Sequence, residues 1–141
     1  MSRYNMKKIS ALIIPVFLLL FLSSFEYGNK QDGDKAVITF ESEVIDFGTI
    51  KQGSEAIREF HFTNTGKAPL IISGIKGQCG CTSIPDSWPK TPIPPGGKGS
   101  FQVKYDTSIR VGLFEKKITV SSNATVPSID VRIKGNVVPA G

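Results

Sequence analysis

Beyond residue 35 the chain alternates between apolar and polar residues with a period of two, which is typical of β-strands. In the segment 56–64, for example, Phe60 and Phe62 fall on one face and His61 falls on the other. No segment beyond residue 35 keeps an apolar period of 3.6 residues over ten positions, so no helix is predicted there. The predicted strands cover residues 37–40, 44–48, 56–64, 70–75, 100–106, 114–121 and 128–134.

Some of these segments and turns allow finer predictions. Gly48 is expected to end the second strand. The run at 70–75 is nearly continuous in apolar residues, which predicts a central strand buried on both faces. In 128–134 charged and apolar residues alternate, which predicts a solvent-exposed face and a position at a sheet edge or in an outer sheet. Gly66, in the turn after the third strand, is expected to need a positive φ angle.

About seven short strands, separated by turn residues, predict an all-β fold, specifically an immunoglobulin-like β-sandwich. A loop with five prolines and Trp88 interrupts the pattern between residues 85 and 95, and proline at this density disfavours strand pairing. The run Pro94-Pro95-Gly96-Gly97 is predicted to close this loop as a turn. The sandwich domain is therefore expected to cover residues 36–141.

The first 24 residues have the features of a secretory signal peptide. Three basic residues precede an apolar run at 9–22, and small residues follow the run. The run is shorter than the ~20 residues that a membrane-spanning helix needs. We therefore expect a signal peptide at 1–24, with an uncleaved N-terminal anchor as the alternative, and a polar linker at 25–35. Either way the domain would lie outside the cytoplasm, in the periplasm, in the cell envelope or in the medium. It would contact a membrane only through an uncleaved N-terminal segment.

The formal net charge of +5 does not indicate a nucleic-acid-binding protein. Arg3, Lys7 and Lys8 lie in the predicted signal peptide, and without them 14 basic residues stand against 12 acidic ones. The other basic residues are scattered, apart from Lys116-Lys117, and they form no basic stripe with interleaved aromatic residues. We therefore expect no nucleic-acid partner, and we expect a protein partner in the envelope whose identity the sequence does not give.

The candidate chemistry lies at Cys79 and Cys81, the two cysteines of the chain, which one glycine separates. On an extended strand their Cα atoms would lie about 6.6 Å apart and their side chains would share a face. A disulfide needs Cβ atoms about 3.5–4.5 Å apart, so a regular strand cannot close it. Gly80 gives the backbone the freedom to kink, and a ring closed in this way is expected to be strained and easily reduced.

Four interpretations of this pair stay open. The thiols, or a tight local disulfide, can pack into the end of the sandwich. As two soft thiolates, Cys79 and Cys81 can bind copper(I) or, with further ligands such as the single histidine His61, zinc. The pair can exchange disulfides in an oxidising compartment, or it can form an intermolecular disulfide. Apart from these metals, no cofactor is expected.

The other polar and aromatic residues form no catalytic constellation, so no enzymatic activity and no catalytic residue are predicted. His61 is expected to face solvent. The glycine-rich run at 96–100 lacks the spacing and the following helix of a phosphate-binding loop. The loop with Trp88, Pro89 and Pro92 is a candidate binding loop, although Trp88 is also suited to covering the open end of the sandwich.

A set of motifs spread over residues 36–138 carries a family resemblance. The motifs are Phe47-Gly48, Phe60-His61-Phe62-Thr63-Asn64-Thr65-Gly66, Cys79-Gly80-Cys81-Thr82, Ile93-Pro94-Pro95-Gly96 and Val120-Ser121-Ser122-Asn123. This set resembles the exported bacterial family called Domain of Unknown Function 1573, which is common among Bacteroidetes. It is more distantly similar to the immunoglobulin-like domains of the abnormal-spindle and hydin type. The resemblance implies an Ig-like sandwich outside the cytoplasm and implies no known reaction.

The sequence therefore predicts an exported binding or structural module of the bacterial cell envelope. The alternative is a thiol site at Cys79 and Cys81 that binds a soft metal or exchanges disulfides. The accessibility of the two sulfur atoms in the folded protein is the property that distinguishes these hypotheses.

Overall fold

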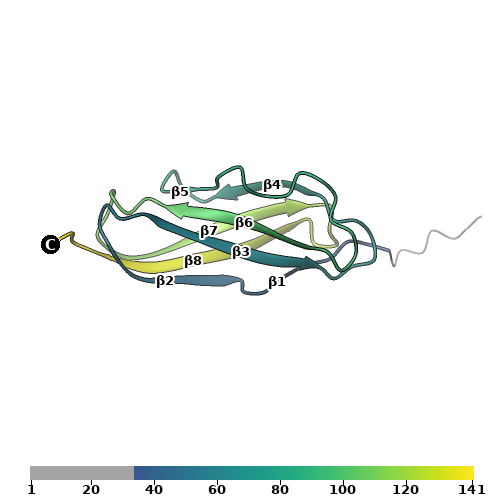
Figure 1. Ribbon diagram of the computed structural model, residues 1–141, viewed down its shortest axis with the longest axis horizontal. Coiled ribbons are helices and arrows are strands. Elements are labelled where there is room, and N and C mark those ends of the chain that lie inside the picture. Colours follow the sequence, from purple (N-terminus) through teal and green to yellow (C-terminus); the bar gives the residue numbers. More distant parts are fainter. Residues whose placement is uncertain (1–33) are drawn as a thin grey trace, which may run out of the picture. The chain divides into compact units, whose positions relative to one another are not determined.

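Eight β-strands form two packed sheets in the computed structural model, which describes residues 34–141 (Figure 1). Within these residues there is no helix, and so none that is long and apolar enough to cross a membrane. The predicted signal peptide and most of the predicted linker lie outside the described residues. The strands are β1 (Ile38–Phe40), β2 (Val44–Lys51), β3 (Ala56–Asn64), β4 (Ile72–Gly77), β5 (Thr82–Ser83), β6 (Lys98–Tyr105), β7 (Gly112–Ser122) and β8 (Ser128–Val138).

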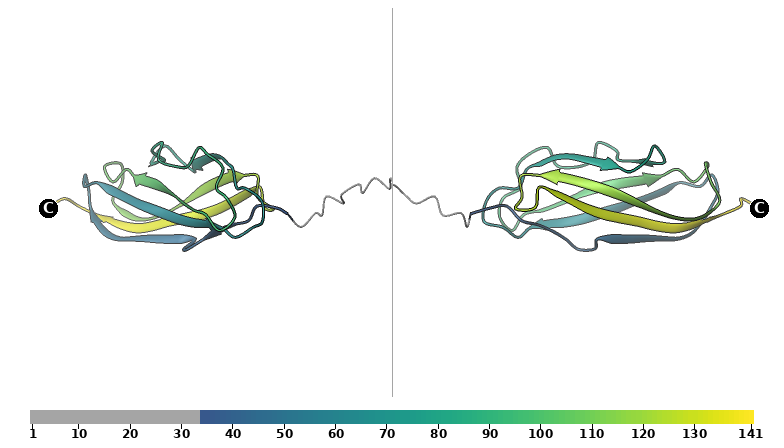
Figure 2. Two further views of the ribbon diagram at one scale, coloured as in Figure 1. Left: turned by 45° about the vertical axis from the view of Figure 1, so that its right-hand side comes forward. Right: turned by 180° about the vertical axis from the view of Figure 1, so that it is seen from behind.

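The strands divide into two four-stranded sheets, which lie as two layers in both views of Figure 2. The first sheet has the order β1-β3-β6-β5, and the second sheet has the order β2-β8-β7-β4. Neighbouring strands are antiparallel, except that β2 and β8 run parallel. This arrangement confirms the predicted all-β sandwich. The sequence pattern did not predict β5, because a strand of two residues is too short to show an alternation.

The core lies between the two layers and is built from the alternating apolar positions. Phe60 on β3 stacks on Phe101 on β6, with ring centroids 5.2 Å apart. Tyr105 of the first sheet stacks on Phe114 of the second sheet with centroids 3.8 Å apart, so aromatic contacts join the layers. The core-facing side predicted for the strand at 56–64 and the alternation predicted for 128–134 are therefore confirmed. The buried apolar residues also include Phe62, Val103, Ile118, Val120, Val131 and Ile133.

The predicted position of β4 within its sheet was wrong, and one of the two positions predicted for β8 is excluded. β4 lies at an edge of the second sheet, next to β7, and not at its centre. The apolar run at 70–75 gave the wrong prediction because its residues are not all buried between strands. Leu70 is buried through a bridge to Ile93 of the proline loop, whereas Ile71 is 45% exposed. β8 lies between β2 and β7, which excludes the predicted edge and leaves the predicted outer sheet, and its charged residues form a solvent-exposed face as predicted.

Two glycines have roles that differ from the predicted ones. Gly48 has a φ angle of 68°, but β2 continues through it with a shift of register between Asp46 and Thr49. It therefore forms an irregularity of the bulge type and does not end the strand. Gly66 does not have a positive φ angle. It is needed for space, because a Cβ atom there would collide with the backbone of residues 35–37.

Asn64, fully buried at the end of β3, joins three connections of the chain. Its Oδ1 accepts hydrogen bonds from the backbone N–H groups of Val37 (3.3 Å) and Gly66 (3.0 Å). Its Nδ2 donates hydrogen bonds to the carbonyl oxygens of Ala68 (2.8 Å) and Ile93 (3.0 Å). One amide thus fixes the start of β1, the turn after β3 and the proline loop. We call this part of the sandwich the Asn64 end.

Candidate functional site

The two cysteines lie in the connection between β4 and β5, residues 78–81, which we call the cysteine turn. β4 belongs to the second sheet and β5 to the first, so the cysteine turn crosses from one layer to the other. On one side Gln78 N–H donates to the Lys117 carbonyl, and on the other side Asp106 N–H donates to the Cys81 carbonyl. β3 runs toward the Asn64 end while β4 runs back, so the cysteine turn lies at the opposite end of the sandwich (Figure 1).

Cys79 and Cys81 are joined by a disulfide, and their Cα atoms are 5.2 Å apart. A regular strand would hold these atoms about 6.6 Å apart. The turn at Gly80 removes the difference, as the expected kink requires. Both cysteines are half-buried, and Cys81 packs against the hydrophobic core. The structure therefore holds the cysteines as a tight local disulfide, with part of the ring open to solvent.

Thr82, directly after the ring, is buried with 5% exposure and places its hydroxyl beside both sulfur atoms. Its Oγ1 lies 3.8 Å from Cys79 Sγ and 3.9 Å from Cys81 Sγ. Gly77 makes room for this arrangement, because a Cβ atom at residue 77 would meet the Thr82 backbone and side chain. The sequence reasoning did not assign Thr82 a role. The one signal in the sequence was the position of Thr82 directly after the two cysteines in the Cys-Gly-Cys-Thr motif. The alternation of apolar and polar residues does not show what this threonine contacts.

A pocket of about 400 Å³, which we call the cysteine pocket, lies next to the disulfide. Cys81 lines it and Cys79 does not. Gly80 also lines it, and a Cβ atom on Gly80 would meet no atom within 4 Å, so this side of the ring is open. The other lining residues are Gly53, Ser54, Glu55, Ser83, Lys104, Tyr105, Asp106, Thr107 and Ser108.

Charged and polar groups surround the cysteine pocket. Lys104 Nζ lies 3.9 Å from the Glu55 carboxylate, and both side chains are at least half exposed. The Ser108 hydroxyl (2.6 Å) and the Ser108 backbone N–H (2.9 Å) donate to the Asp106 carboxylate. These hydrogen bonds lower the pKa of Asp106, whereas burial raises the pKa of Tyr105. The lining of the pocket therefore includes an ammonium group, two carboxylates and several hydroxyl groups.

The metal hypothesis concerns a reduced form of the protein, because copper(I) or zinc would bind thiolates and not a disulfide. In the described part of the chain, no three His, Cys, Asp or Glu residues lie close enough together to hold a metal ion. His61 is exposed on β3, where its Nε2 lies 3.9 Å from the Glu59 carboxylate. The solvent-facing position predicted for His61 is confirmed. Metal binding at Cys79 and Cys81 stays a prediction.

The candidate binding loop is folded onto the sandwich. Trp88 is half-buried and packs against the core, and Lys90 Nζ lies over its ring, 3.0 Å from the centroid. The Gln102 backbone N–H donates to a loop serine hydroxyl, which ties the loop to β6. Trp88 thus covers part of the core, while Pro89 is half-buried and Pro92 is exposed. A binding role of this loop stays a prediction.

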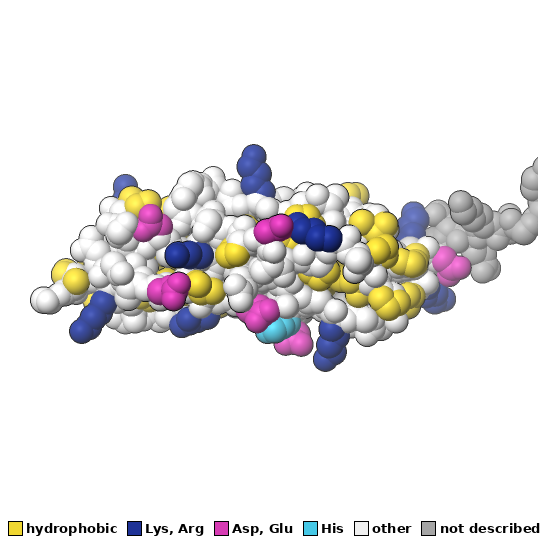
Figure 3. Space-filling model, turned by 45° about the horizontal axis from the view of Figure 1, so that its top comes forward, with side chains coloured by type: hydrophobic (Ala, Val, Ile, Leu, Met, Phe, Trp, Pro, Cys, Tyr) yellow, Lys and Arg dark blue, Asp and Glu magenta, His cyan; other side chains and the backbone are white. Residues whose placement is uncertain are grey.

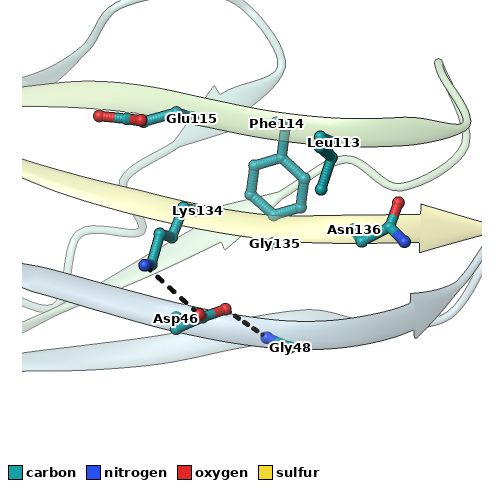
Figure 4. Close-up of a pocket in the computed structure, with 8 residues that line it drawn as sticks. All are labelled: Asp46, Gly48, Leu113, Phe114, Glu115, Lys134, Gly135 and Asn136. Carbon is teal, nitrogen blue, oxygen red and sulfur yellow. Dashed lines mark hydrogen bonds and ion pairs between the residues drawn. The ribbon is translucent and has the colours of Figure 1, made fainter.

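A second hollow of about 480 Å³, the outer groove, lies on the solvent face of the second sheet (Figure 4). Leu113, 86% exposed, lies at one side of it, and Lys134 pairs with Asp46 at 3.6 Å on the other side. The Phe114 ring lies against Gly135, where a Cβ atom would collide with the ring. The sequence did not predict this groove, because its lining residues come from three separate strands.

Acidic and basic side chains intermingle on the surface. On the second sheet Arg132 pairs with Glu115 and Lys117 pairs with Asp130, each at 3.1 Å. On the face seen in Figure 3, charged groups of both signs are scattered, and hydrophobic side chains gather toward the end where the described chain begins. The expectation of no nucleic-acid partner and of an envelope protein partner stays a prediction.

The sequence matches the model of one protein family. The match is to the protein of unknown function (DUF1573) family and covers residues 38–137. The chain therefore belongs to this family, which confirms the resemblance carried by its motifs. The family description assigns no reaction. A comparison with curated proteins gave no match.

Several solved structures share the fold. A protein of unknown function from Porphyromonas gingivalis W83 has a TM-score of 0.65 and 16% identity, covering 79% of this chain and 51% of its own. The ASH/PapD-like domain 7 of human CEP192 has a TM-score of 0.61 and 8% identity, covering 77% and 89%. The VesB protease of Vibrio cholerae has a TM-score of 0.58 and 16% identity, covering 73% and 32%. The chain thus spans about half the length of the Porphyromonas protein. At these identities the likeness shows an Ig-like or PapD-like sandwich and no function.

Proposed function

We propose that this DUF1573 protein is an exported binding or structural module of the bacterial cell envelope, with a protein partner and no reaction of its own. The observation that carries the proposal is the match of residues 38–137 to a family without an assigned reaction, folded as a PapD-like sandwich. Support for export comes from the N-terminal sequence, where basic residues precede an apolar run at 9–22.

Export is tested by locating the full chain in a Gram-negative host. We expect the protein in the periplasmic or envelope fraction, with an intact mass that corresponds to cleavage near Ser24. As a control, Leu18→Arg with Leu19→Arg should retain the protein in the cytoplasm, because two charges interrupt the apolar run. Recovery of the unaltered chain in the cytosol at its full mass would contradict the proposal.

A second candidate function is thiol–disulfide exchange at Cys79 and Cys81. The observation that favours it is a disulfide in a half-exposed turn beside an open pocket. In the chain-entropy account, a cross-link that closes a loop of three residues stabilises a fold by only about 1.6 kcal/mol, against about 3 kcal/mol for 15 residues. So small a loop makes this disulfide a weak structural brace, which supports a chemical role.

The exchange function is tested at equilibrium in glutathione buffers of varying ratio. We expect oxidised and reduced protein to coexist in these buffers, measured by alkylation and intact mass, while the circular dichroism stays that of the folded chain. Oxidised protein at every glutathione ratio would contradict the function. Adding copper(I) to the reduced protein examines the alternative, because uptake of one ion that fails in Cys79→Ser and Cys81→Ser would indicate a metal site.

A further inference from the structure

The Thr82 hydroxyl is a buried polar group whose neighbours are the two sulfur atoms of the disulfide. At 3.8 and 3.9 Å, its Oγ1 is almost equally far from Cys79 Sγ and Cys81 Sγ. Among the described residues no buried side-chain oxygen or nitrogen lacks a hydrogen-bond partner, and the partners of this hydroxyl are these sulfurs. An oxidised sulfur is a weak acceptor, whereas a thiolate is a charged and stronger one. The hydroxyl is therefore placed to stabilise the reduced state of the ring.

The two sulfurs differ in how they can be approached. Cys81 lines the cysteine pocket and Cys79 does not. The pocket opens over Gly80, where even a Cβ atom would have free space. Its volume of about 400 Å³ lies within the ~300–1,000 Å³ range of small-molecule sites. A reagent that enters this pocket therefore meets the Cys81 side of the disulfide.

We infer that the cysteine pocket is the entry site for an incoming thiol, that Cys81 Sγ is the sulfur attacked, and that Thr82 positions and stabilises the departing Cys79 thiolate. This inference rests on the exchange function proposed above. In the first step the external thiolate forms a bond to Cys81 Sγ, the Sγ–Sγ bond breaks, and Cys79 Sγ leaves with the electron pair. Thr82 O–H donates a hydrogen bond to that thiolate. A second external thiol then attacks the mixed disulfide, which leaves both cysteines reduced and the external thiols joined.

The lining of the pocket indicates the class of thiol. Lys104, Glu55 and Asp106 carry charges, and Ser54, Ser83 and Ser108 carry hydroxyls. This lining suits a polar thiol that carries a positive and a negative charge. Both a low-molecular-weight amino-acid thiol and a cysteine within a polar peptide segment fit this description. The shared chemistry is a thiolate flanked by an ammonium or amide group and a carboxylate. Glutathione and a cysteine peptide with blocked ends serve as probes for the two sources.

The role of Thr82 is tested by the rate constant for reduction of the native protein by glutathione. Loss of a hydrogen bond to a charged group in Thr82→Val should slow reduction by about threefold to tenfold. Thr82→Ser keeps the hydroxyl and should restore the rate, which a role in packing alone would not produce. Equal rates for Thr82→Val and the unaltered protein, or equal slowing by both variants, would overturn the assignment of Thr82.

Entry through the pocket is tested away from the core. Ser83 is exposed on β5 and lines the pocket, whereas Ser73 is exposed on β4 outside it. Ser83→Trp should slow reduction by glutathione, and Ser73→Trp should not. Peptide mapping of the mixed disulfide, trapped at the earliest times, should find glutathione on Cys81. An unchanged rate in Ser83→Trp for both glutathione and the blocked cysteine peptide, or glutathione on Cys79, would overturn the inference although the exchange function would stand.

The blocked cysteine peptide separates the two sources of thiol. Slowing of both probes by Ser83→Trp supports the pocket as a general thiol entry, and slowing of the peptide alone supports a polypeptide thiol. If neither probe reduces the unaltered protein in its folded state, the exchange function itself fails, and the inference fails with it.

Discussion

The two ends of the sandwich hold irregular backbone in contrasting ways. At the Asn64 end a fully buried amide makes four hydrogen bonds to groups in three separate connections of the chain. At the other end a covalent ring joins Cys79 and Cys81, only two positions apart, and stays half-exposed. The non-covalent hub ties three connections together, whereas the covalent bond ties together only its own turn.

This difference shows that the strength of a bond does not determine how much the bond contributes to the stability of the fold. A cross-link stabilises a fold by restricting the unfolded chain, and a ring of three residues restricts it little. A buried amide that loses its partners leaves several polar groups unsatisfied, which costs about 1–3 kcal/mol for each. The Asn64 end is therefore expected to determine the stability of the fold. The disulfide of the cysteine turn is expected to react while the protein stays folded.

The largest effect should come from Asn64→Ala. This change removes the Asn64 partner of two part-buried N–H groups and two carbonyl oxygens and leaves a cavity at a fully buried position, so we expect a loss of about 3–5 kcal/mol in the free energy of unfolding. Urea unfolding at constant m value measures the loss. Asn123→Ala is the matched control, because Asn123 makes the same kinds of bonds, to Ile71 N–H and the Pro69 carbonyl, but is exposed. If Asn64→Ala lowers the free energy of unfolding no more than Asn123→Ala does, Asn64 does not stabilise the fold as proposed.

A pair of glycine substitutions compares the two ends directly. Gly66→Ala should destabilise the fold by about 1–3 kcal/mol, because its Cβ atom would collide with backbone that cannot rotate away. Gly80→Ala should change stability by no more than about 0.5 kcal/mol, because its Cβ atom meets open space. Thermal unfolding of the two variants, side by side, checks the order. A larger destabilisation by Gly80→Ala than by Gly66→Ala would contradict the claim that the Asn64 end determines stability.

Removal of the disulfide should have a smaller effect than the change at Asn64. The double variant Cys79→Ser with Cys81→Ser should lose about 1.6 kcal/mol, the contribution of a three-residue loop. Unfolding of the oxidised and the reduced protein in urea measures the same quantity without mutation. A loss above about 3 kcal/mol would show that the ring is a structural brace, which the chemical interpretation does not allow.

The smallest effect is expected on the outer face of the second sheet, at Asp130. The Thr119 hydroxyl, at 2.7 Å, is the main cause that lowers the pKa of this carboxyl, and Lys117 adds to it. Because the pKa of Asp130 is lower in the folded protein, its ionised carboxylate stabilises the fold at a pH above the unfolded-state pKa of about 4. This stabilisation is lost as the pH falls through the folded-state pKa. Thr119→Val should raise the pKa of Asp130 in an NMR titration, and Lys117→Gln should raise it less. No change in Thr119→Val would contradict the stated cause.

Much of the fold could be predicted because strand alternation is local. The pattern located β3 at Ala56–Asn64 and identified the face with Phe60 and Phe62, because each side chain's face follows from its neighbours in sequence. The order of strands in a sheet depends on pairing between distant segments. For that reason the pattern placed β4 at the centre of a sheet, which was wrong, and could not decide whether β8 lies at an edge or within an outer sheet.

The site was located by its residue types, and its geometry was not. Cys79 and Cys81 stood out as the only cysteines, and the kink at Gly80 followed from chain dimensions. The cysteine pocket joins the cysteine turn to residues near Ser54 and Ser108, which sequence pattern does not bring together. Thr82 lay in the motif, but its contact with both sulfurs depends on the crossing from β4 to β5.

The most direct test of this account is the urea dependence of disulfide reduction, measured at low concentrations where the chain stays folded. The account predicts that dithiothreitol reduces Cys79–Cys81 at a rate that hardly changes with urea, because the ring reacts in the folded protein. If instead the logarithm of the rate rises with urea in proportion to the m value for unfolding, the ring reacts only after the whole fold opens. That result would contradict the claim that the cysteine turn is chemically available beside a stable sandwich.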